Sequence, residues 1–214
     1  MTNHAARWRM TEDGMTQGAD QVPSRAGEEQ RAAPRERTLY ALGRLMVAGR
    51  QHVCTVRNLG PGGAGIELDP PPAVGAAVTI ETRDLIARAA TVRWVREMMV
   101  GLSFDEPLGE ATLRAVAETP RSPRFRYDGP VELVIDARLT EHRAIDLGLG
   151  GVRVAGAPPA DAGSAIEVVI DAELVVRGKL AWTGDDAFAI EFAAPLSVRQ
   201  LAGAIARLEA TLRR

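Results

Sequence analysis

Residues 58–63 read NLGPGG, and residues 146–151, which lie 88 positions further along the chain, read DLGLGG. Adding 88 to a position brings back the same kind of residue, without a gap, from position 58 to position 108. The matching pairs include Asn58 and Asp146, Gly60 and Gly148, Gly62 and Gly150, Gly63 and Gly151, Gly75 and Gly163, Trp94 and Trp182, Phe104 and Phe192, and Pro107 and Pro195. A register of this length indicates a duplicated domain.

The first copy of this stretch also spells GxGxxG over residues 60–65, the pattern of dinucleotide-binding loops. That pattern marks a nucleotide site only where a strand ends and a helix begins. Here three prolines follow at residues 70–72, and they cannot continue a helix. The second copy has Arg153 in place of the third glycine. The shared feature is therefore a strand end with Asn or Asp before a tight turn, and Pro61 followed by Gly62 predicts a type II turn.

Each copy consists of short segments in which apolar and polar residues alternate, which is typical of half-buried antiparallel strands. In the first copy these segments lie at residues 43–48, 52–59, 64–68, 76–82, 87–95 and 99–104. In the second copy they lie at residues 131–135, 142–147, 151–155, 165–170, 175–182 and 187–192. Six short strands in each unit predict a small barrel or a sandwich.

A helix is expected after the last strand of each copy, and the pattern is clearest in the second. Ser197 and Gln200 have the spacing of a capping box. An apolar stripe then follows, made of Val198, Leu201, Ile205, Leu208 and Leu212. We favour a helix packed on its own barrel, but the stripe also fits a short seam between two subunits, so a homodimer through this helix stays open.

The composition is that of an ordinary globular protein, with 46% hydrophobic and 25% charged residues. The net charge of −2 argues against binding to nucleic acid, because proteins that bind it without specificity carry a basic excess. No stretch approaches the length of a membrane span, so no membrane insertion is expected. A single cysteine, Cys54, fits a reducing compartment, and we expect a cytoplasmic protein. Residues 1–30 are polar and without periodicity, which predicts a flexible arm.

Catalytic and metal-binding residues do not form a recognisable set. His4, His52 and His142 are scattered, and Cys54 corresponds to His142 under the repeat. No chemically active residue is therefore duplicated together with the scaffold, and no spacing of His and Cys is that of a zinc site. We expect a protein that is not an enzyme and that has neither a metal nor a cofactor.

The chain resembles the PilZ domain family, whose members are six-stranded antiparallel barrels with a C-terminal helix. The family's signature is Arg-x-x-x-Arg near the start of the domain, then [Asp/Asn]-x-Ser-x-x-Gly further on. Arg31 and Arg35, followed by residues 58–63, have this order and spacing, and residues 146–151 repeat the second motif. The resemblance implies a mostly β protein of two tandem six-stranded barrels, each followed by a C-terminal helix. The implied domains are residues 31–119 and 120–214, after the arm at residues 1–30.

The resemblance also implies that the protein binds cyclic di-GMP and relays its level to a protein partner, which the sequence does not identify. A guanidinium group can pair with phosphate or with the Hoogsteen edge of guanine, and glycine lets a flat ligand approach the backbone. The implied ligand-binding residues are Arg31, Arg35, Asn58, Gly60 and Gly63 in the first copy, and Arg124, Arg126, Asp146, Gly148 and Gly151 in the second. The first copy is the stronger candidate, because it alone has Arg-x-x-x-Arg.

Both copies depart from the family at one position. Gly60 and Gly148 stand where the family has serine, which removes a hydroxyl group that helps to bind guanine in the family. The alternative is therefore a degenerate PilZ adaptor that binds no nucleotide and acts as a protein-interaction module.

Overall fold

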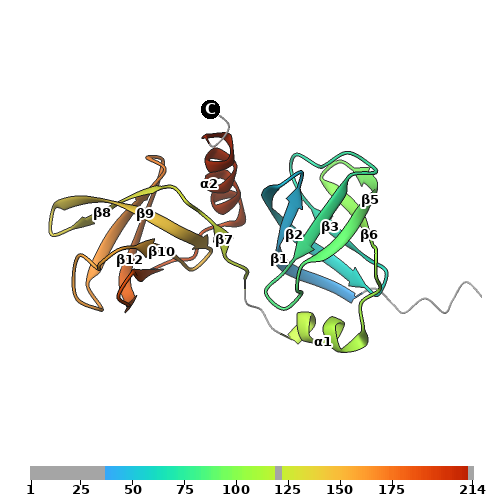
Figure 1. Cartoon of the computed structure of the whole chain (residues 1–214), viewed down its shortest axis with the longest axis horizontal. Coiled ribbons are helices and arrows are strands. Elements are labelled where there is room, and N and C mark those ends of the chain that lie inside the picture. Colours follow the sequence, from blue (N-terminus) through green and yellow to red (C-terminus); the bar gives the residue numbers. More distant parts are fainter. Residues whose placement is uncertain (1–36, 119–121, 212–214) are drawn as a thin grey trace, which may run out of the picture. The chain divides into compact units, whose positions relative to one another are not determined.

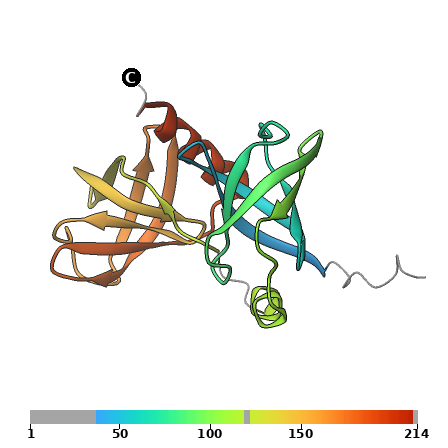
Figure 2. The same ribbon diagram turned by 45° about the vertical axis from the view of Figure 1, so that its right-hand side comes forward.

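The computed structural model of the chain describes residues 37–118 and 122–211, and these residues belong to one compact unit. The predicted arm at residues 1–30, together with Arg31, Arg35 and Arg121, lies outside the described residues. The described chain is mostly β, as predicted, and it forms two barrels with a helix after each (Figure 1, and turned by 45° in Figure 2). No helix within the described ranges has the length and apolar character needed to cross a membrane.

The first barrel is a closed ring of six antiparallel strands. Its elements are β1 (Arg37–Val47), β2 (Arg50–Gly60), β3 (Gly63–Glu67), β4 (Ala77–Glu81), β5 (Arg88–Arg96) and β6 (Met99–Phe104), followed by the short helix α1 (Glu110–Glu118). The ring closes in the order β1-β2-β3-β6-β5-β4. Alternate side chains point inward, and Leu45, Ile66, Ile80 and Val100 are fully buried in this core.

The second barrel repeats this ring with one change. Its elements are β7 (Phe125–Arg126), β8 (Pro130–Ile135), β9 (Arg138–Gly148), β10 (Gly151–Ala155), β11 (Ala165–Ile170), β12 (Leu174–Thr183) and β13 (Ala187–Phe192), followed by the helix α2 (Val198–Thr211). The six strands β8 to β13 close through the pairing of β9 with β10, and β7 adds to the free edge of β9.

The strand β7 was not predicted, because two residues are too short to show an alternation. It corresponds to the beginning of β1. Arg126 pairs with Asp146 just as Thr38, 88 positions earlier, pairs with Asn58. The single long first strand of the first barrel is therefore split into β7 and β8 in the second, with Tyr127–Gly129 between them.

Backbone hydrogen bonds confirm the sequence repeat. The Phe104 N–H donates to Gly62 O, and the Phe192 N–H donates to Gly150 O, each at 2.9 Å. The irregularities of the strands repeat as well, since β5 and β12 both lose register just before their tryptophan. The duplication therefore includes details of backbone geometry as well as the order of strands.

The helix α2 begins with the predicted capping box and packs against residues of both barrels. The Ser197 N–H donates to Oε1 of Gln200 at 2.9 Å, and the Gln200 N–H donates to Oγ of Ser197 at 3.2 Å. Its buried residues Leu201, Ala204, Ile205 and Leu208 join the core of the second barrel. The favoured interpretation, a helix packed on its own barrel, is confirmed only in part, because α2 also packs against β2 of the first barrel. Val198 is exposed, and Leu212 lies outside the described chain.

The prediction of a type II turn at Pro61 and Gly62 is wrong. A type II turn needs a positive φ at its third residue, and Gly62 does not have one. The Leu108 N–H donates to Pro61 O at 2.7 Å, which fixes the peptide that a type II turn would rotate. The Leu196 N–H donates to Leu149 O at 2.8 Å in the second barrel, so a distant segment sets the turn in both copies.

Candidate functional site

Asn58 lies near the end of β2 and is partly exposed. It pairs with Thr38 of β1 on one side and with Gly65 of β3 on the other. Its Oδ1 accepts the Gly65 N–H at 2.7 Å, so the carboxamide folds over Gly65. A Cβ at Gly65 would lie 2.6 Å from this oxygen, which explains the glycine. With Oδ1 engaged, the Nδ2 amide is the group that can donate to a ligand.

Asp146 takes the place of Asn58 in the second barrel, but its contacts are different. Its carboxylate forms an ion pair with Nε of Arg124, and its Oδ2 lies 2.8 Å from Nη2 of Arg153. The Arg124 guanidinium also reaches the Gly151 carbonyl at 3.4 Å. The Asp146 side chain is 13% exposed, whereas those of Arg124 and Arg153 are 46% and 48% exposed. Two half-exposed cations around one carboxylate leave a net positive site that suits an anion.

Arg153 was missed as a site residue, although the sequence carried a signal for it. It replaces Gly65 of the first copy, and it pairs directly with Asp146 across β9 and β10. Opposite charges at directly paired positions of two strands attract each other. The substitution of a glycine by arginine beside the motif acid was therefore a readable sign of an ion pair.

Arg126 was also predicted as a site residue, but it is not an ion-pair partner of Asp146 within the described chain. It pairs with Asp146 in strand register, but the ion pairs of that carboxylate within the described chain are with Arg124 and Arg153. Arg126 instead lines a cavity of about 520 Å³, together with Arg44 and Gln51. Its carbonyl oxygen accepts a hydrogen bond from Nε2 of Gln51.

The motif glycines have structural roles of their own. A Cβ at Gly63 would overlap the carbonyl oxygen of Leu102, and a Cβ at Gly151 would overlap that of Ile190. Both glycines are therefore required where two strands of the barrel approach each other closely. Gly148 differs, because a Cβ there would meet its nearest atom, Cγ of Arg124, at 3.7 Å. The second barrel thus has space for the side chain of the family's serine.

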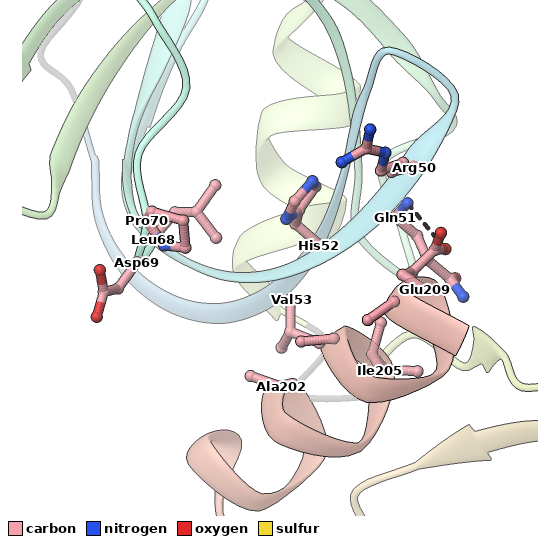
Figure 3. Close-up of a pocket in the computed structure, with 12 residues that line it drawn as sticks. Arg50, Gln51, His52, Val53, Leu68, Asp69, Pro70, Ala202, Ile205 and Glu209 are labelled. Atoms are coloured by element: carbon pink, nitrogen blue, oxygen red, sulfur yellow. Dashed lines mark hydrogen bonds between the residues drawn. The ribbon is translucent and has the colours of Figure 1, made fainter. Parts of the chain in front are cut away.

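A second cavity, of about 300 Å³, lies where α2 packs on the start of β2 (Figure 3). His52 and Glu209 face it, and the Gln51 N–H donates to Oε1 of Glu209 at 3.4 Å. Burial lowers the pKa of His52, although the negative charge of Glu209 acts in the opposite direction. No prediction from sequence concerned this cavity.

Cys54 and His142 are side chains of types that can act in catalysis, but burial shifts the pKa of each away from reactive values. Burial raises the pKa of the Cys54 thiol to about 12, so it is protonated and unreactive at neutral pH. His142 packs edge-on against Phe188 at 5.6 Å between ring centroids, and burial lowers its pKa. Within residues 37–118 and 122–211, no group of three or more His, Cys, Asp or Glu is arranged to hold a metal ion.

Comparison with known proteins assigns both halves of the chain to one type of domain. The model of the PilZ domain matches residues 29–119 and, separately, residues 118–210. Among curated proteins, no match was found.

Several solved structures are similar at low identity. PlzA of Borreliella burgdorferi, in complex with c-di-GMP, is 10% identical with a TM-score of 0.35, over 78% of this chain and 88% of PlzA. YcgR of Escherichia coli, also in complex with c-di-GMP, is 18% identical with a TM-score of 0.31, over 80% of this chain and 85% of YcgR. The inhibitor of motility of Bacillus subtilis, MotI/DgrA, is 12% identical with a TM-score of 0.30, over 82% of this chain and 100% of MotI/DgrA.

Proposed function

The chain belongs to the PilZ domain family, and we propose that it is a non-enzymatic receptor for cyclic di-GMP. The observation that supports this most directly is the contact between Arg124 and Asp146. Arg124 immediately precedes β7, which corresponds to the start of the first strand of a barrel. An arginine just before the first strand therefore lies beside the acid of the glycine turn, which supports a shared site for the two.

The first barrel repeats the strand pairing, although position 36, which corresponds to Arg124 under the repeat, is a glutamate. Thr38 pairs with Asn58 as Arg126 pairs with Asp146, and Arg35 precedes Thr38 by three residues. Three residues of chain span at most about 10 Å, so chain length is compatible with the proposal that Arg35 and Asn58 bind the same ligand. We assign the main site to Arg31, Arg35 and Asn58, with Gly60 and Gly63 in the turn beside them.

The chemistry of these groups matches the ligand. Cyclic di-GMP has two phosphodiester charges, which guanidinium groups bind through paired hydrogen bonds. The Hoogsteen edge of guanine offers the acceptors O6 and N7, and the Nδ2 amide of Asn58 is a donor that can reach such an edge. Neither the phosphates nor the base requires a metal ion or a catalytic group from the protein.

The second barrel provides a weaker site at Arg124, Asp146, Gly148 and Gly151. The carboxylate of Asp146 is already paired with two guanidinium groups, and a ligand has to replace at least one of these contacts. Arg126 is directed to a separate cavity. Competition from internal ion pairs favours the first barrel as the principal receptor.

A route for relaying the signal begins at Arg124. The Arg124 carbonyl accepts a hydrogen bond from Nη1 of Arg44 at 3.5 Å, and the Arg126 carbonyl accepts one from Nε2 of Gln51. Both donors belong to the first barrel, so the segment that holds Asp146 also contacts the neighbouring domain. A ligand that moves Arg124 changes these contacts and thereby the surface offered to a protein partner.

Isothermal titration calorimetry with cyclic di-GMP tests the receptor function. We expect micromolar or tighter binding by the wild type, loss of most of this binding in the double variant Arg31→Ala/Arg35→Ala, and a smaller loss in Arg124→Ala. Arg177→Ala is the control, because this arginine is 86% exposed and pairs with Glu167, which is not a motif residue. Absence of binding by the folded wild type would refute the receptor and favour the ligand-free adaptor.

A further inference from the structure

The first barrel has an irregular stretch where β1, β2 and β3 meet beside Asn58. In the pairing of β1 with β2, Leu39 and Tyr40 lie opposite Arg57 alone. In the pairing of β2 with β3, the register also shifts at Arg57. Two residues opposite one form a β-bulge, which redirects side chains and is common beside functional sites. The residue directly before the motif is therefore at a bulge on both of its edges.

The bulge brings the side chains of two consecutive residues, Arg57 and Asn58, to the same face of the barrel. In a regular strand they would point to opposite faces. The Asn58 carboxamide folds over Gly65, and Glu67 follows Gly65 by two residues in β3, so Glu67 lies on the same face. Nε and Nη2 of Arg57 both donate to Oε2 of Glu67, Nε at 2.7 Å. The guanidinium is thus held on the face that carries the motif residue.

Tyr40 covers this guanidinium and is otherwise open to solvent. Cζ of Arg57 lies over the Tyr40 ring, 4.8 Å from its centroid. Tyr40 is nevertheless 75% exposed, so the ring face away from Arg57 is open to solvent. An exposed aromatic side chain changes rotamer readily, whereas a cation that lies over the ring and is itself bound to a carboxylate favours one position. Tyr40, Arg57 and Glu67 therefore form a platform that presents a flat ring near Asn58.

The second barrel has no counterpart of this platform. The positions that correspond to its three side chains under the repeat are occupied by Asp128, Ile145 and Ala155. Asp128 forms an ion pair with Arg143 instead. Because the second barrel closes the same ring of strands without the platform, the fold does not require it. The platform belongs to the barrel that is assigned the main ligand site, which indicates a role in binding.

We propose that Tyr40 is a further ligand-binding residue, whose open ring face stacks on a guanine base of cyclic di-GMP, and that Arg57 is the residue that positions this ring. This inference rests on the proposed receptor function and adds to it two residues outside both family motifs. Proteins that bind an unstacked base combine an aromatic surface with hydrogen bonds to the base edge. Tyr40 supplies the surface, and the Nδ2 amide of Asn58 supplies a donor.

Calorimetry on variants of Tyr40 tests the stacking. Loss of one stacking contact corresponds to about 1–3 kcal/mol, so Tyr40→Leu is expected to raise the Kd for cyclic di-GMP about 5- to 150-fold. Tyr40→Phe is the matched control, because it keeps the ring, and the Kd is expected to stay close to that of the wild type. Ile86→Ala is a second control, since this residue of the same barrel is 86% exposed. Wild-type affinity in folded Tyr40→Leu would overturn the stacking role.

A double-variant cycle tests the positioning role of Arg57. A cation over an exposed ring contributes about 0.5–1 kcal/mol, so Arg57→Leu is expected to raise the Kd about 2- to 5-fold. In the Tyr40→Leu background the same change is expected to have no further effect, because Arg57 acts through the ring. An equal effect in both backgrounds would contradict the positioning role, since Arg57 would then act on the ligand without the ring.

Nuclear magnetic resonance gives a measurement that leaves the platform unchanged. The chain has two tyrosines, Tyr40 and Tyr127, and Tyr127 is buried in the core of the second barrel. With tyrosine labelled on the ring, the Tyr40 signals are expected to move upfield as cyclic di-GMP is added, because a stacked base shields the ring, while the Tyr127 signals stay in place. Unchanged Tyr40 signals at saturation would overturn the stacking role while leaving the receptor function intact. Absence of any binding by the wild type would instead remove the receptor function, so the two failures are distinguishable.

Discussion

The two barrels have the same backbone but use their motif residue in opposite ways. In the first, Asn58 makes a local hydrogen bond to the neighbouring strand and keeps one donor available. In the second, Asp146 holds two arginines, one from β10 and one from the segment before β7. Under the proposed function, the first copy keeps a donor for the ligand, whereas the carboxylate of the second copy occupies the arginines that would bind it. Duplication preserved the scaffold and allowed the two sites to diverge.

The largest effect is expected from the glycines that the two barrels share. Gly63→Ala and Gly151→Ala each place a methyl group against a carbonyl oxygen of the neighbouring strand, which cannot move without opening the barrel. We expect each variant to lower the free energy of unfolding by about 3 kcal/mol or more, measured by urea denaturation. The controls are Gly62→Ala and Gly150→Ala, where an added Cβ meets nothing within 4 Å. Equal stability of Gly63→Ala and Gly62→Ala would contradict the shared close approach.

A smaller effect on the free energy of unfolding is expected from the motif residues, and it differs between the barrels. The loss of the neutral Asn58 is expected to cost more than the loss of the charged Asp146. Asn58→Ala leaves the N–H of the buried Gly65 without its partner, which costs about 1–3 kcal/mol. Asp146→Ala releases two half-exposed arginines to solvent, and ion pairs of this exposure contribute about 1 kcal/mol or less. We therefore expect the neutral residue to contribute more to the free energy of unfolding than the charged one.

Salt dependence makes this comparison sharper. High salt screens the ion pairs of Asp146 and does not affect the hydrogen bond of Asn58 in the same way. The difference in unfolding free energy between Asp146→Ala and wild type is expected to shrink in 1 M NaCl, while the difference for Asn58→Ala stays constant. Two differences that respond alike to salt would show that the sites do not differ in the way the contacts indicate.

A further effect, smaller again, comes from pH and involves one histidine in each barrel. Burial lowers the pKa of His52 and of His142 below the ordinary value of 6.5. The unfolded chain therefore takes up protons at a higher pH than the folded chain, and stability falls as pH decreases from above 6.5 through the folded pKa values. Urea midpoints are expected to be lower at pH 5.5 than at pH 7.5, and His52→Gln and His142→Gln should each reduce this difference. A midpoint that rises on acidification would contradict it.

Much of this fold could be predicted from the sequence, because alternation and the repeat support each other. The strands β6, β10, β11 and β13 have the predicted limits, and the capping box of α2 is formed as expected. The two-residue strand β7 could not be predicted from periodicity. It was nevertheless encoded in the repeat, since its pairing with β9 copies the pairing of β1 with β2.

Less of the candidate site could be predicted from the sequence, because its contacts join residues of neighbouring strands that are far apart in the chain. The two motifs indicated that arginine and the turn acid belong together, and Arg124 meets Asp146 as this implies. Arg153 reaches the motif from a paired strand, and its replacement of Gly65 in the repeat was the one sign of this in the sequence. The turn type was mistaken for the same reason, since the hydrogen bond that sets it comes from Leu108.

The smallest expected effect on stability comes from restoring the family's serine in the second barrel. Gly148 has no positive φ, and a Cβ there makes only ordinary contact with Arg124 at 3.7 Å, so Gly148→Ser is expected to leave the free energy of unfolding within about 0.5 kcal/mol of wild type. The new hydroxyl adds one hydrogen bond for guanine, worth about 0.5–1.5 kcal/mol, or about a 2- to 12-fold gain in affinity at that barrel. Calorimetry should then report tighter binding at the second, weaker site, a gain that Gly150→Ser does not produce. If Gly148→Ser leaves this affinity unchanged, the ion pairs of Asp146, and not the missing hydroxyl, weaken the second site.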